Sequence, residues 1–102
     1  MTLQELETIL NTAAIPVAHY QTATTTYPHI VYQEISTTAI WASSNAFKEQ
    51  ISVEVSHFTK EPFDPSLAQL KAVLHKNKLG FTISHSFNPE NKVILNQFSL
   101  NI

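Results

Sequence analysis

The chain contains no cysteine, which excludes disulfides, thiolate metal sites and cysteine nucleophiles. Arginine is also absent, and arginine is the side chain that grips phosphates, carboxylates and guanine edges with a bidentate fork. The only glycine, Gly80, cannot build a phosphate-binding loop, because such loops need several glycines at fixed spacing. These absences exclude cysteine-based chemistry and the glycine-rich phosphate-binding loops.

Charge is scarce as well. The net charge is −2, and 14% of the residues are charged, against about 25% in an ordinary domain. Tight nucleic-acid binding depends on surplus positive charge that neutralises phosphates, so no specific nucleic-acid binding is expected. The polar surface must consist largely of Thr, Ser, Asn and Gln. Such a surface is easily desolvated and suits burial in an assembly.

The length of 102 residues, with 43% hydrophobic content, predicts a single domain that spans residues 1–102. No apolar run approaches the ~20 residues that cross a bilayer, so no membrane partner is expected. The N-terminus has no basic patch ahead of an apolar stretch, and no secretory signal is expected there.

Two helices are predicted, at residues 2–12 and 65–77. The first opens with a capping box of Thr2 and Glu5, and the second has Asp64 as its N-cap. Apolar residues at helical spacing predict one buried stripe on each helix: Leu3, Leu6, Ile9 and Leu10 on the first, and Leu67, Leu70, Val73 and Leu74 on the second. Gly80 is expected to end the second helix.

Five strands are predicted from alternating or β-rich runs, at residues 16–20, 29–35, 50–58, 81–87 and 92–100. In the third, Ile51, Val53 and Val55 share one face, which is typical of a half-buried antiparallel sheet. Residues 36–49 join the second and third strands as a long hairpin with its tip at residues 43–45. The order α-β-β-β-α-β-β predicts an α+β fold, with a mostly antiparallel sheet of about four to five strands and two helices packed on one face.

No catalytic, cofactor-binding or metal-binding constellation is visible, so the chain is not expected to be an enzyme or to need a cofactor. The histidines lack the spacing of paired metal ligands and are interpreted as isolated surface or half-buried side chains, although His57 and His85 could meet across the sheet. Glu34 and Glu54 lie on neighbouring predicted strands and could form a carboxylate pair. Solvent-facing strand positions are the commoner explanation.

The aromatic residues fall into two groups. Those on predicted strands are expected in the core: Tyr20, Tyr32, Phe81 and Phe87. Ile40, Trp41 and Phe47 flank the hairpin tip instead, in a stretch without charge. They either fold back over the sheet edge or form a partner-facing contact, as buried aromatic residues do at interfaces. We carry these three residues forward as the candidate site of partner or oligomer contact.

The chain resembles the small tail terminator (tail-completion) proteins of long-tailed bacteriophages over nearly its whole length, in the layout of its elements and in short phrases. The matching phrases are Ile15-Pro16-Val17-Ala18, Tyr27-Pro28-His29-Ile30-Val31-Tyr32, Asn45-Ala46-Phe47, Thr59-Lys60-Glu61-Pro62-Phe63-Asp64-Pro65, and the closing hairpin from Gly80-Phe81 to Asn96-Gln97-Phe98. The chain departs from the family along the second helix, where members are richer in charge, so the surface of that helix serves a different contact if the resemblance holds.

The resemblance implies a structural virion protein of the phage tail and neck, made in the host cytoplasm. Its partners would be further copies of itself in a hexameric ring, the tail-tube protein that the ring caps, and a neck protein on the head side. Two alternatives stay open: another neck protein, such as a head-closure or connector protein, and an unrelated small protein-binding domain.

Overall fold

The computed structural model describes residues 2–20, 27–41 and 47–102. Its elements follow the predicted order and lie close to the predicted bounds: α1 Leu3–Asn11, β1 Val17–His19, β2 His29–Trp41, β3 Phe47–Thr59, α2 Pro65–Lys76, β4 Thr82–Asn88 and β5 Val93–Asn101. No helix in these described ranges has the length and apolar character needed to cross a membrane.

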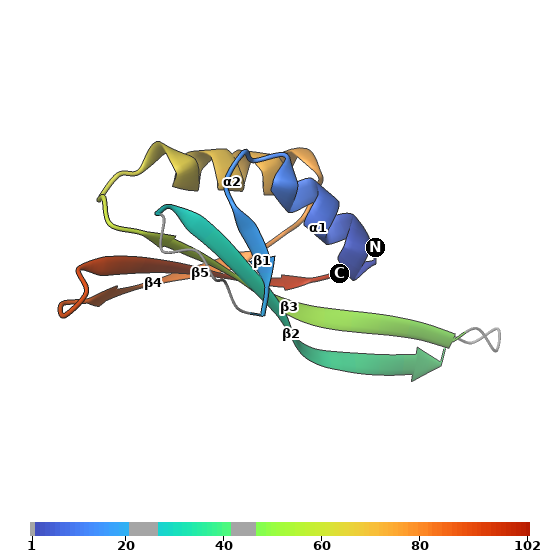
Figure 1. The fold of residues 1–102 in the computed structure, drawn as a ribbon. Coiled ribbons are helices and arrows are strands. Elements are labelled where there is room, and N and C mark those ends of the chain that lie inside the picture. The colour runs from blue at the N-terminus through green and yellow to red at the C-terminus, as the bar shows by residue number, and fades with distance from the viewer. Residues whose placement is uncertain (1, 21–26, 42–46) are drawn as a thin grey trace.

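The five strands form one sheet in the order β1-β2-β3-β5-β4. β1 runs parallel to β2, and the other neighbouring strands are antiparallel. Both helices lie on the same side of the sheet (Figure 1), so the opposite face carries no helix. The predicted α+β fold, with its mostly antiparallel sheet and two helices, is confirmed.

Local capping explains where the helices begin. The Thr2 hydroxyl accepts a hydrogen bond from the Glu5 backbone N–H at 3.1 Å and donates one to the Glu5 carboxylate at 3.2 Å. Thr2 is therefore the expected N-cap, but the Glu5 carboxylate bonds to the Thr2 hydroxyl and not to its backbone N–H, as a full capping box requires. The Asp64 carboxylate accepts from the Ser66 N–H at 2.9 Å. Pro65 occupies the first turn of α2, where its missing N–H leaves no bond unmade.

The end of α2 differs from the prediction, because Gly80 does not form it. The C-cap is Asn77, and Lys78 takes the left-handed conformation with a φ of 58°. The N–H groups of Lys78 and Leu79 bond back to the carbonyls of His75 and Leu74, which is the Schellman arrangement usually built on glycine. In this glycine-poor chain a lysine holds that position.

The core lies between the sheet and the two helices. Predicted core residues that are buried are Leu6, Leu10, Leu70 and Leu74 from the helices and Val53 and Val55 from β3. Ile9, Ile51 and Leu67 are half-buried. Tyr32 and Phe98 are the largest of the fully buried side chains. Because Val53 and Val55 are buried, the alternation along β3 predicted the buried face correctly.

Two of the four strand aromatics expected in the core are exposed. Tyr20 is 56% exposed and Phe87 is 59% exposed. Tyr20 follows the last residue of β1 with a φ of 69° and stacks on His19 at 4.2 Å. Phe87 lies near the end of β4, the last strand of the sheet, where a strand has a neighbour on one side only. Alternation predicts which face of a strand a side chain lies on, but it does not predict how far along the strand the helices cover that face.

Candidate protein interface

The long hairpin leaves the body of the domain as a two-stranded arm, which we define as residues 36–41 of β2 and 47–51 of β3. β1 pairs with β2 only from Ile30 to Tyr32, and β5 pairs with β3 only from Ser52 onward. Beyond Tyr32 and Ser52, β2 and β3 pair with each other; among the described residues, the further backbone bonds to the arm are the two between Ile51 and Ile102, at its base. Figure 1 shows the arm extending past the helices at one end of the molecule.

A β-bulge marks the base of the arm. Glu34 pairs with Val53 and Ser36 pairs with Ser52, so Ile35 is an extra residue in β2. Bulges bend a strand and increase its twist, and here the bend falls where the arm begins. Ile35 is 56% exposed, which is unusual for an isoleucine in a strand.

The arm carries the three residues singled out from the sequence. Trp41 pairs directly with Phe47, and Ile40 pairs with Lys48, at the outer end of the two strands. The backbone of these residues therefore lies in the arm, and their contact with a partner stays a prediction. The tip expected at residues 43–45 lies outside the described residues. The strand residues nearer the base, 35–39 on β2 and 49–50 on β3, are exposed.

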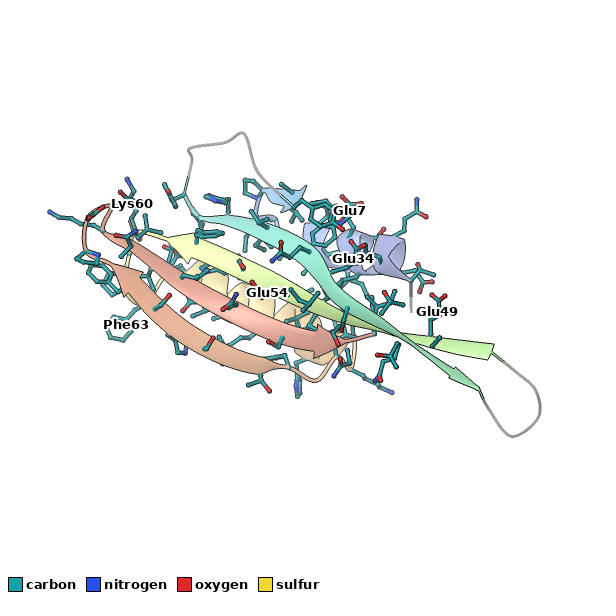
Figure 2. All side chains as sticks on the ribbon, turned by 90° about the horizontal axis from the view of Figure 1, so that it is seen from below. Glu7, Glu34, Glu49, Glu54, Lys60 and Phe63 are labelled. Carbon is teal, nitrogen blue, oxygen red and sulfur yellow. The ribbon has the colours of Figure 1, made fainter. Side chains whose placement is uncertain are left out.

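In the body of the domain, outside the arm, the helix-free face of the sheet is almost uncharged. The strand residues on this face are Ala18, His29, Val31, Gln33, Ser52, Glu54, Ser56, Phe58, Thr82, Ser84, Ser86, Asn88, Val93, Leu95, Gln97, Ser99 and Asn101. Glu54 is the single acid among them and lies near the middle of the face (Figure 2). Its carboxylate accepts a hydrogen bond from the Gln97 amide.

Aromatic side chains gather at the end opposite the arm. Phe63 is fully exposed, with a relative accessibility of 101%, and its backbone is left-handed with a φ of 60°. Figure 2 shows it at the end of the sheet remote from Glu49 on the arm. A cavity of about 280 Å³ lies against Phe63, His85 and Ile94. The two ends of the molecule therefore differ: the arm projects from one, and the exposed Phe63 and the cavity lie at the other.

A buried polar network crosses the sheet under α2. His57 is completely buried, and its Nε2 lies 2.7 Å from the Ser66 hydroxyl. Asn96 contacts His57 Nδ1 through its amide nitrogen at 3.2 Å and His85 Nδ1 through its amide oxygen at 2.6 Å. His57 and His85 thus meet through Asn96, and the description of every histidine as isolated is wrong for His57.

The Ser66, His57 and Asn96 atoms resemble a serine–histidine–asparagine relay, but their surroundings favour a structural role. Ser66 is 7% exposed, and its hydroxyl bonds to a fully buried ring. Neither Ser66 nor His57 lines the cavity of about 280 Å³, which Asn96 does line. No buried side-chain polar atom of the described residues lacks a hydrogen-bond partner, as a satisfied core network requires.

The two glutamates suggested as a carboxylate pair lie on opposite faces of the sheet. Glu34 pairs with Val53, whereas Glu54 pairs with Gln33, so their side chains alternate to different sides. Glu34 instead lies 2.5 Å from His19 Nε2. This hydrogen bond is the main cause that holds the pKa of Glu34 below its ordinary value. The carboxylate-pair hypothesis is therefore wrong.

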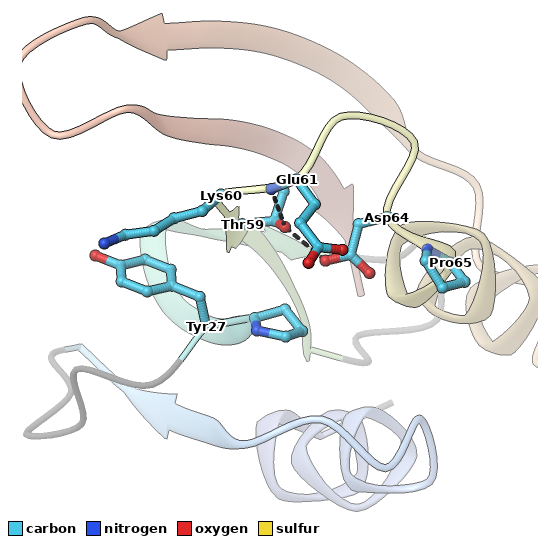
Figure 3. A pocket seen from close by; sticks show the side chains of 7 residues that line it. Tyr27, Thr59, Lys60, Glu61, Asp64 and Pro65 are labelled. Atoms are coloured by element: carbon cyan, nitrogen blue, oxygen red, sulfur yellow. Dashed lines mark hydrogen bonds between the residues drawn. The ribbon is translucent and has the colours of Figure 1, made fainter.

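A second cavity, of about 390 Å³, lies between the start of β2 and the start of α2 (Figure 3). Lys60 Nζ lies 4.9 Å from the centre of the Tyr27 ring. The Thr59 hydroxyl donates to the Asp64 carboxylate at 2.5 Å, which already uses an oxygen of that group. Within the described ranges no group of three or more His, Cys, Asp or Glu residues is placed to hold a metal ion.

Sequence inspection missed Asn96 and Phe63. Asn96 lies on β5, between β3 and β4, and contacts a histidine on each of these strands. No local sequence pattern encodes this strand order. Phe63 lies between Pro62 and Asp64-Pro65, and this proline-flanked aromatic was available as a signal for an exposed loop residue.

No protein-family model matches the chain, and the search of curated proteins gave no match.

Proposed function

We propose that the protein is a structural virion protein: a tail terminator that forms a ring, caps the phage tail tube and provides the joint to the head. The proposal takes its specific role from the resemblance described above. The observation that carries it is the arm, a two-stranded projection whose described base is exposed and which has no charged residue from Ile35 to Phe47.

Exposed apolar surface is typical of regions that become buried in an assembly, and Ile35 at the base of the arm is 56% exposed. Ile40, Trp41 and Phe47 are the contact residues in this proposal. Aromatic anchors surrounded by small polar residues are the usual centre of a protein interface, and the arm sequence has that composition.

The helix-free face of the sheet supports the role in a second way. In the body of the domain, where β3 is paired from Ser52 onward with β5, Glu54 is the only acid of this face and no lysine lies on it; Lys48 lies farther out, on the arm. A ring through which DNA passes must not hold phosphates, and a face of Ser, Thr, Gln and Asn meets that requirement.

The experiment is to polymerise the tail-tube protein of the phage that encodes this chain, with and without the purified chain. Electron microscopy should show shorter tubes with a ring at one end. The double variant Trp41→Ala/Phe47→Ala should lose the cap, whereas Gln69→Ala, on the exposed side of α2, should retain it. Tubes that grow unchanged with the wild-type chain would contradict the proposal, and binding to the portal-side protein instead would assign a neck role.

A further inference from the structure

Among the residues that the structure describes, nothing pairs with the outer edge of β4. β4 has 7 residues, Thr82–Asn88, and is the last strand in the sheet order, with β5 as its only neighbour in this part of the chain. Every residue except Ile83 is exposed. Free edges normally carry lysine, proline, a bulge or a very short strand, which prevent pairing with other chains. β4 has no Asp, Glu or Lys, and its pairing with β5 is continuous.

The opposite edge of the sheet is protected against pairing with another chain near the body of the domain, but it is unprotected along the arm. β1 has 3 residues, the short type of edge strand that resists pairing. Past Tyr32, β2 has no neighbour on its outer side in the described part of the chain. From Ile35 to Trp41 this strand contains no charged residue and no proline. This outer edge of the β2 arm is similar in length to β4.

A side-chain cavity adjoins the β4 edge. His85 of β4 lines the cavity of about 280 Å³, together with Phe63 and Ile94. Binding by strand addition uses two elements, which are a free backbone edge and a neighbouring pocket that receives alternate side chains. Both elements are present on this side of the sheet.

We propose that the β4 edge of one copy pairs with the outer edge of the β2 arm of a second copy, so that the sheet continues from subunit to subunit. This inference rests on the proposed ring, and it names the surfaces that form it. The two edges lie on opposite flanks of the sheet, so each subunit offers one donor and one acceptor. Contacts between unlike surfaces are heterologous and generate rings when their rotation closes.

The β4 edge and the outer edge of the β2 arm both lack charged residues, which supports a second copy of the chain as the partner of the β4 edge. Pairing two uncharged strands buries no unpaired ion, whereas the outer edge of β3 in the arm carries Lys48 and Glu49. An isologous pairing of two β4 edges would leave the arms without a partner, and it would stop at a dimer.

Disulfide cross-linking tests the pairing directly, because the chain has no cysteine of its own. Thr38→Cys places a thiol on the arm, and Ser84→Cys places one on β4; both positions are exposed. A mixture of the two variants should form a mixed disulfide on oxidation, and the double variant should give a ladder of oligomers. A Ser84→Cys homodimer without a mixed product would show isologous pairing and overturn the proposal.

A charge on the edge provides an independent test. Ser84→Lys should weaken self-association by about tenfold or more, with an unchanged melting temperature because Ser84 is exposed. Gln69→Lys, an equal charge change on α2, should associate like the wild type. Sedimentation velocity measures all three chains.

The outcomes separate this inference from the proposed function. If Ser84→Lys associates as the wild type does, or if the wild type stays monomeric at its highest attainable concentration, the edge pairing is wrong. Capping of tail tubes is a different readout and can persist in either case. If Ser84→Lys and the cross-links behave as expected but tubes are not capped, the pairing stands and the tail-terminator role fails.

Discussion

The Ser66 hydroxyl oxygen lies 2.7 Å from Nε2 of His57, a ring that is completely buried. Asn96 contacts the other ring nitrogen at 3.2 Å. A neutral imidazole can donate through one nitrogen and accept through the other, so these two partners satisfy it without charge. Burial is the main cause that lowers the pKa of His57 from its ordinary value of 6.5; the nearby Asp64 raises it and His29 lowers it further.

Mild acid should therefore destabilise the protein. Below pH 6.5 the unfolded chain protonates this histidine, while the folded chain does not until its lowered pKa is reached. The unfolded state then binds more protons, so the free energy of unfolding decreases as the pH falls through this window. The lowered pKa values of Glu34 and Asp64 act at lower pH, below their ordinary values of 4.5 and 3.8.

Urea denaturation between about pH 8 and about pH 5 measures this slope. His57→Gln has no titratable group at this position. Its free energy of unfolding should be lower than that of the wild type at every pH, but it should change less between about pH 7 and about pH 5.5. Gln69→Ala, on the exposed side of α2, is the control and should keep the wild-type slope. An equal slope in His57→Gln and the wild type would show that another group controls the acid response.

Leu70 should be a stability-determining residue of α2. It is completely buried between the helix layer and the sheet, and Leu70→Ala should lower the free energy of unfolding by about 2–5 kcal/mol. Thermal or urea denaturation measures the change. Gln69→Ala on the adjacent exposed position should alter stability by less than about 0.5 kcal/mol, and a similar loss in both variants would contradict the packing described here.

The only glycine should be dispensable. Gly80 has no positive φ, and a Cβ added to it would meet nothing within 4 Å. Gly80→Ala should raise the free energy of unfolding by about 0.4–1 kcal/mol, because alanine restricts the unfolded chain. Lys78→Gly should also stabilise, since Lys78 holds the left-handed position that glycine favours. A loss of stability in Gly80→Ala greater than the measurement error would contradict the backbone conformation and the open space described for Gly80.

The sequence predicts the local parts of this fold well. Capping at Thr2 and at Asp64 defines the helix starts, and alternation at Val53 and Val55 defines the buried face of β3. Both signals involve neighbouring residues, whose geometry is set by short-range backbone chemistry.

Non-local features were not predictable in the same way. The relation of Glu34 to Glu54 depends on which face of β2 is buried. The sequence leaves this open, because apolar residues occur at both alternations of the strand: Ile30 and Tyr32 on one, Val31 and Ile35 on the other. The bulge at Ile35 and the position of β5 between β3 and β4 also depend on long-range pairing. The Asn96 network follows from that strand order, so the candidate arm was visible in the sequence, whereas the polar network was not.

The arm itself gives the last prediction, which concerns assembly rather than stability. Trp41→Ala and Phe47→Ala should each weaken assembly by more than about 1 kcal/mol if these residues are interface anchors. The folded domain should persist, because the backbone of both residues lies in the arm, beyond the pairing of β3 with β5. Melting temperature and sedimentation velocity, measured on each variant, separate the two effects. Leu70→Ala is the opposite control and should lower the melting temperature first. If Trp41→Ala and Phe47→Ala instead unfold the monomer while leaving the association of the remaining folded protein unchanged, the hairpin is a structural element and the partner contact must lie on another surface.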